Sequence, residues 1–117
     1  MMRLAIFSFL AVIFLYESSF AGNKIGIGPG VITCYEFLHP TKGYEGRGRD
    51  DAFLYWAQGY MTSKNIHSET NIHLSTIDID EQIVIMKVYC EEHKRDRVYD
   101  AVEFLYNELY KKGKQEK

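Results

Sequence analysis

Apolar residues recur at steps of three and four positions in the last third of the chain. The stripe consists of Val98, Ala101, Val102, Leu105 and Leu109. This spacing predicts an amphipathic helix with one face packed into a core. We expect Asp96 to cap this helix at its N-terminus and Gly113 to end it.

A second apolar stripe of the same period lies between Asp50 and about Ile66. It consists of Phe53, Trp56, Ala57, Tyr60 and Met61. The stripe predicts another helix, with Asp50 as its N-cap. Gly59 lies inside this segment and costs about 1 kcal/mol relative to alanine, so we expect another helix to approach closely there.

The first predicted helix begins at a capping motif. Thr33 and Glu36 have the spacing at which the threonine hydroxyl accepts from the glutamate N–H while the carboxylate binds back to the threonine backbone. The helix carries Cys34 and Phe37, and Pro40 limits its length.

The segment from Asp80 to Lys94 is apolar on nearly all sides in its first half. Its length and the capping pair Asp78 and Glu81 favour a buried central helix. Its β-branched residues leave a strand as the alternative. Four short helices without internal repeats predict a small all-α bundle over residues 31–113, followed by a charged tail at 114–117.

The N-terminal segment, residues 1–21, has the pattern of a cleavable signal peptide. Arg3 precedes an apolar run that ends before Glu17, and small residues stand at the expected cleavage site after Ala21. The run is too short to cross a membrane as a helix. Four glycines and one proline in residues 22–30 predict a flexible lead-in to the helical domain.

Composition excludes several classes of protein. The 117 residues carry 14 basic and 16 acidic side chains, a formal net charge of -2, and lack the basic excess of nucleic-acid binders. A hydrophobic content of 46% is too high for a disordered chain. No segment after the signal peptide could span a membrane, and we expect a protein partner and no membrane association after signal removal.

Cys34 and Cys90 are the two cysteines of the chain. In an oxidising compartment, two lone cysteines of one small domain favour a disulfide with each other. This bond would close a loop of about 57 residues and stabilise the fold by roughly 4 kcal/mol. The alternatives are a zinc site, with Cys34 near His39 and Cys90 near His93, and a reactive thiol.

No complete catalytic motif is present, so the sequence predicts a protein without enzymatic activity, cofactor or bound metal. His67 and His73 fall in a polar loop, where histidines are usually solvated, and metal binding by this pair is the weaker alternative. Adjacent acidic pairs at helix ends are better explained by capping than by acid–base catalysis.

Tyrosines form a ridge beside the apolar stripe of the last helix. Tyr99, Tyr106 and Tyr110 lie on one side of it, and Trp56 is the lone tryptophan of the chain. Tyrosine and tryptophan bury large areas while keeping a polar tip, so both are enriched at interfaces. These four residues either bind a partner protein or complete a thin core.

In combination, these elements resemble the HdeA/HdeB-like superfamily of small periplasmic helical proteins. The resemblance covers about residues 31–110. It rests on Thr33-Cys34-x-Glu36-Phe37, on Tyr55-Trp56-Ala57-x-Gly59-Tyr60-x-x-x-x-Asn65, and on Tyr89-Cys90 before an amphipathic helix. It implies a periplasmic location, an HdeA-like bundle with a disulfide between the two cysteines, and a homodimer at neutral pH.

The resemblance implies one of two functions. One branch of the family consists of acid-stress chaperones, which loosen in acid and bind unfolded clients. Protonation would take the charge of residues 22–117 from -2 to about +17, which favours loosening by self-repulsion. The alternative is an immunity or inhibitor protein that blocks a cell-wall hydrolase or secreted effector, although such proteins usually have a second cysteine pair.

Overall fold

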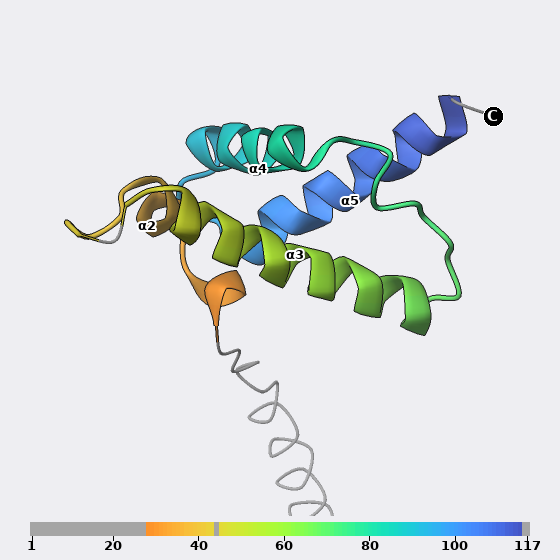
Figure 1. Cartoon of the computed structure of the whole chain (residues 1–117), viewed down its shortest axis with the longest axis horizontal. Coiled ribbons are helices and arrows are strands. Elements are labelled where there is room, and N and C mark those ends of the chain that lie inside the picture. Colours follow the sequence, from red (N-terminus) through yellow and green to blue (C-terminus); the bar gives the residue numbers. More distant parts are fainter. Residues whose placement is uncertain (1–27, 44, 116–117) are drawn as a thin grey trace, which may run out of the picture.

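A computed structural model of the chain describes residues 28–43 and 45–115, and this part is all-helical (Figure 1). Its elements are the 3₁₀ helix η2 (Pro29–Val31) and the α-helices α2 (Cys34–Leu38), α3 (Arg47–His67), α4 (Ile79–Glu92) and α5 (Val98–Gln115). In Figure 1, α4 lies above α3, and α5 runs diagonally between them. The predicted signal peptide, residues 1–21, lies outside the described residues.

The core is built around α5. Every residue of the predicted stripe from Val98 to Leu109 is fully buried. Phe37 of α2, Met61 of α3 and Met86 of α4 belong to the same apolar cluster. The stripe therefore lets α5 pack against the other three α-helices, which confirms the predicted all-α bundle.

The capping motif at the start of α2 is present in both directions. The Glu36 N–H donates to the Thr33 hydroxyl at 3.2 Å, and the Thr33 N–H donates to the Glu36 carboxylate at 3.0 Å. The bond from the Thr33 backbone is the main cause that lowers the pKa of Glu36. The helix ends at Leu38, two residues before Pro40, as predicted.

The predicted Cys34–Cys90 disulfide joins α2 to the last turn of α4, with the two Cα atoms 4.8 Å apart. Backbone hydrogen bonds extend this connection, because the Cys34 N–H donates to the Asp96 carbonyl and the Val98 N–H to the Ile32 carbonyl. Residues 32–37 and 90–98 thus form one fixed unit, the disulfide end. Both sulfur atoms are in the bond, so the zinc and reactive-thiol alternatives are wrong.

The start of α3 differs from the prediction. The helix begins at Arg47, and Gly46 is its N-cap with φ at 112°, a backbone conformation that glycine adopts without strain. Asp50 lies in the first turn, where its carboxylate accepts a hydrogen bond from Lys87 at 2.7 Å. Asp50, the predicted N-cap, therefore forms an ion pair with α4 and does not cap α3.

Both ends of α5 also differ. The Asp96 carboxylate accepts from the Tyr89 hydroxyl at 2.6 Å, and this bond, with burial, raises the pKa of Tyr89 to about 12. Asp100 binds the Arg97 N–H before the first turn of α5 in its place. At the other end the helix continues through Gly113 to Gln115, because glycine weakens a helix by about 1 kcal/mol without stopping it.

The third predicted segment is a helix, so the strand alternative is wrong, but α4 is not buried on all sides. Its buried residues are Gln82, Met86 and Cys90, which share one face. Val84 and Val88 on the opposite face are about half exposed. The Asp78 carboxylate caps the helix by accepting from the Ile79 N–H.

Glycines show a further difference from the prediction. Residues 28–30 of the predicted lead-in are packed, and Gly30 is buried against the indole ring of Trp56. A Cβ at Gly30 would overlap the six-membered ring of that side chain. Gly59, where close approach of another helix was expected, has no neighbour near the position a Cβ would take.

We predict that the C34A/C90A variant loses about 4 kcal/mol of unfolding free energy, because the unfolded chain is no longer closed into a loop. Urea denaturation followed by circular dichroism measures the difference. Wild-type protein kept reduced is the matched control and should behave like the variant. A variant as stable as the oxidised wild type would contradict this prediction.

We predict that G30A destabilises the fold by about 1–3 kcal/mol, because its methyl group would displace the Trp56 ring. The matched control is G59A, an exposed helix position that should gain about 1 kcal/mol. Thermal unfolding of the two variants measures both effects. A neutral G30A would show that η2 is not packed on Trp56.

Candidate functional site

The four residues predicted to bind a partner do not share one exposed surface. Tyr99 and Tyr110 are 41% and 45% exposed, whereas Tyr106 is buried. The Tyr106 hydroxyl donates to the Asn65 side-chain carbonyl at 2.7 Å. Trp56 packs against η2 and stacks on a neighbouring tyrosine. Tyr99 and Tyr110 are thus the exposed members of the predicted set.

Three of the candidate histidines contact residues of their own helix or helix end. His39 and His93 contact the rings of Tyr35 and Tyr89, four residues before each of them. His67 hydrogen-bonds to the Ser63 carbonyl within its own helix. Within residues 28–43 and 45–115, no three His, Cys, Asp or Glu side chains gather into a possible metal site.

The inner face of α3 is its most apolar surface. Phe53, Leu54, Ala57 and Met61 are all buried. α3 has no disulfide to another helix, because the bond joins α2 and α4. Apolar packing of this face and the polar side chains around it therefore hold α3 on the core.

The main polar contact between α3 and α5 is the Glu103 cluster, formed by Tyr60, Lys64 and Glu103. The Tyr60 hydroxyl donates to one Glu103 oxygen at 2.5 Å, and the Lys64 ammonium donates to the other. The Lys64 and Glu103 side chains are each about one-third exposed. The cluster is thus a hydrogen-bonded ion pair at the edge of the core.

The Glu103 cluster shifts the pKa values of its members. Burial alone raises the pKa of Glu103, but the hydrogen bonds from Lys64 and Tyr60 and the charge of Lys64 outweigh it, so the pKa lies below its usual value. Burial, then the bond to Glu103 and the charge of Asp100, raise the pKa of Tyr60 to about 12. Both shifts show that the cluster is built around an ionised Glu103.

Further polar contacts, ionic and neutral, hold α3 on α4 and on the loop after α3. Asp50 pairs with Lys87 of α4. The Gln58 amide donates to the buried Gln82 of α4 at 2.6 Å, and the Asn65 amide donates to a carbonyl of the loop after α3. Acid can remove the Glu103 contacts, whereas the hydrogen bonds of the Gln58 and Asn65 amides do not depend on protonation.

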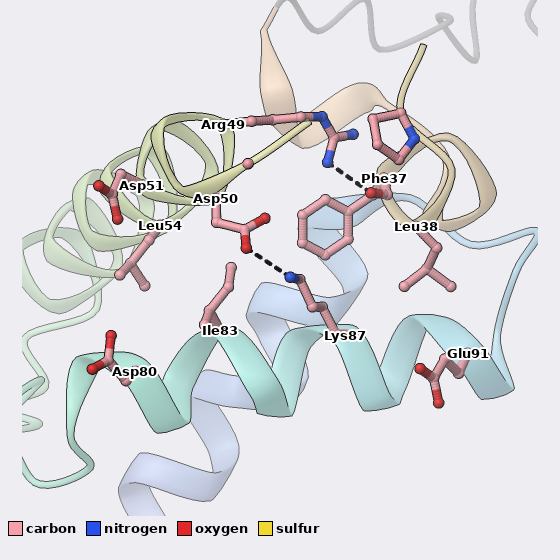
Figure 2. A pocket seen from close by; sticks show the side chains of 12 residues that line it. Phe37, Leu38, Arg49, Asp50, Asp51, Leu54, Asp80, Ile83, Lys87 and Glu91 are labelled. Atoms are coloured by element: carbon pink, nitrogen blue, oxygen red, sulfur yellow. Dashed lines mark hydrogen bonds and ion pairs between the residues drawn. The ribbon is translucent and has the colours of Figure 1, made fainter. Parts of the chain in front are cut away.

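A cleft of about 630 Å³ lies between three helices (Figure 2). It is lined by α2, by the first turns of α3 and by one side of α4. We call it the α3–α4 cleft. Its apolar lining includes Leu38, Leu54 and Ile83, and the Asp50–Lys87 pair crosses its middle. Carboxylates stand at its two ends, Asp51 and Asp80 at one and Glu91 at the other.

Arg49 closes the upper side of the α3–α4 cleft in Figure 2. Its guanidinium donates to the Phe37 carbonyl at 2.8 Å and to the Glu36 carbonyl at 3.0 Å. The same group lies over the Phe53 ring, 4.8 Å from its centre. The hydrogen bonds satisfy carbonyls at the end of α2. Together with the contact to the Phe53 ring, they engage the guanidinium group within the protein.

A smaller cleft of about 350 Å³ lies between the end of α5 and the loop after α3. Its lining includes Ile72, His73, Leu109 and Tyr110. His73, a candidate metal ligand in the sequence, and Tyr110, a predicted partner-binding residue, thus line the same cleft.

No family model, curated protein or solved structure matches this chain. In the described part of the chain, no helix combines the length and apolar character that a membrane span requires.

Sequence patterns could not identify the residues that hold α3. Glu103 borders the apolar stripe of α5, and about 40 positions separate it from Tyr60 and Lys64. Tyr60 and Lys64 are four residues apart and share one helix face. That spacing is the available signal, but it does not indicate which carboxylate lies opposite.

We predict that E103Q flattens the acid dependence of stability. Because the folded state lowers the pKa of Glu103, its contribution is complete above the pKa of an unfolded glutamate and is lost as pH falls through the folded-state value. Between pH 6 and pH 3 the wild type should lose about 1 kcal/mol more than E103Q. Urea denaturation at each pH measures this difference.

The matched control is E108Q, on the same helix, where Glu108 forms a looser ion pair with Lys111 at 3.4 Å. This variant should follow the wild-type pH profile. Identical profiles for E103Q and wild type would mean that the Glu103 cluster does not contribute to acid sensitivity.

Proposed function

We propose that this protein is exported to the periplasm and acts there, without enzymatic chemistry, as a chaperone that acid activates through release of α3. The observation that carries the proposal is the attachment of α3 to α5 and α4 through two carboxylates, Glu103 and Asp50. The resemblance to HdeA/HdeB-like proteins supports the same function.

Protonation weakens one side of the molecule more than the other. Falling pH neutralises Glu103, while the positive charge of Lys64 remains. The contacts of the disulfide end include a covalent bond and backbone hydrogen bonds between helix ends, which acid does not remove. The rise in net positive charge adds repulsion throughout the chain. α3 is therefore the helix that acid is expected to release.

Release of α3 would expose apolar surface on two faces. One is the inner face of α3, including Phe53 and Met61, and the other is the part of α5 that it contacts, including Tyr106. Exposed apolar patches of this kind bind other apolar chains. The disulfide would limit further expansion of the remaining helices, so that client binding is reversible on return to neutral pH.

We predict that the oxidised protein suppresses aggregation of a client enzyme at pH 2–3 and not at pH 7, measured by light scattering. Hydrogen exchange in acid should show loss of protection in α3 before α4 and α5. The D50N/E103Q variant should protect the client at a pH about one unit higher, because its carboxylate contacts are already weakened. E108Q should behave as wild type.

Two results would contradict the proposal. Absence of client protection in acid would exclude the chaperone function. Simultaneous loss of hydrogen-exchange protection in α3, α4 and α5 would exclude release of α3 as its mechanism.

A further inference from the structure

We infer that the α3–α4 cleft is a binding site for a cationic, apolar peptide segment of another protein at neutral pH. This inference is independent of the acid-activated function, because it concerns the closed structure. It rests on the shape of the cleft, the arrangement of its apolar side chains and the sign of its charge.

The size and lining of the cleft suit a few side chains of a peptide. A volume of about 630 Å³ lies within the usual range for ligand sites. Leu38, Leu54 and Ile83 supply apolar walls from three different helices, so an inserted peptide would meet apolar surface along the cleft. Figure 2 shows Leu54 and Ile83 pointing into the space between α3 and α4, and Leu38 pointing from α2 toward α4.

The charge of the cleft selects a cationic ligand. Four carboxylates and two basic groups line it. Both basic groups are engaged, since Arg49 donates to backbone carbonyls and Lys87 pairs with Asp50. Asp51 and Glu91 make no ion pair within the part of the chain that the structure describes. A ligand would thus meet unneutralised negative charge.

The carboxylates at the two ends of the cleft favour a peptide over a small cation. Asp51 and Glu91 lie on different helices at opposite ends, and the described residues contain no cluster that could hold a metal ion. Ile83 and Glu91 are eight residues apart on α4, which corresponds to about 12 Å. About four residues of an extended peptide cover that distance, which places an apolar side chain near Ile83 and a basic one near Glu91.

The test uses the oxidised full protein without its signal segment and a fluorescent peptide in which arginines flank a short run of leucines. Binding is followed by fluorescence anisotropy at pH 7 and low salt. The D51N/E91Q variant should weaken binding about tenfold or more. The matched control is E92Q, next to Glu91 but outside the lining of the cleft, which should bind as wild type.

Two further peptides separate charge from apolar contact. Replacing the arginines by glutamates should abolish binding, and replacing the leucines by serines should weaken it about tenfold. I83S should lose affinity for the leucine peptide, with circular dichroism confirming that it is folded.

Absence of binding by wild type, equal binding of the glutamate peptide, or full affinity in D51N/E91Q would each overturn the inference. If the peptide does not bind but the protein protects its client in acid, the inference about the cleft is wrong and the chaperone function is supported. If the peptide binds but the client is not protected in acid, the binding site is supported and the chaperone function is wrong.

Discussion

The Cys34–Cys90 disulfide is the constraint on which the rest of the structure depends. It joins α2 to the end of α4 at a point where backbone bonds also attach the start of α5. Three helix ends are thus connected by a covalent bond and by backbone hydrogen bonds, none of which depends on an ionised side chain. A domain of this size buries a limited fraction of its surface, so a covalent connection contributes much of its net stability.

This constraint divides the molecule into a fixed part and an attached part. α4 and α5 share a long packed interface near the disulfide, whereas α3 is connected to the disulfide end through the segment after α2 and is held by side chains. Its apolar inner face supplies most of the attraction, because burial of apolar area is the dominant stabilising effect. The Glu103 contacts make that attachment depend on pH.

The fold was largely predictable from local patterns, and the site was not. The period of the α5 stripe and the pair Thr33 and Glu36 each determine structure within a few residues, and both predictions are confirmed. Asp50 and Asp96 were assigned to helix capping, but each carboxylate has a partner from a distant or adjoining element. Composition cannot reveal such partners, because their proximity exists only after the helices have packed.

The two proposed activities would require opposite states of the same helix. α3 is one wall of the α3–α4 cleft, and its inner face also covers the core. A cationic segment bound in the cleft would stabilise the closed state, since it contacts α3 and α4 together. Acid would weaken the Glu103 contacts that hold α3, and release of α3 would remove one wall of the cleft. Loss of the neutral-pH ligand and exposure of apolar surface would thus occur together, so that one conformational equilibrium would separate the two functions.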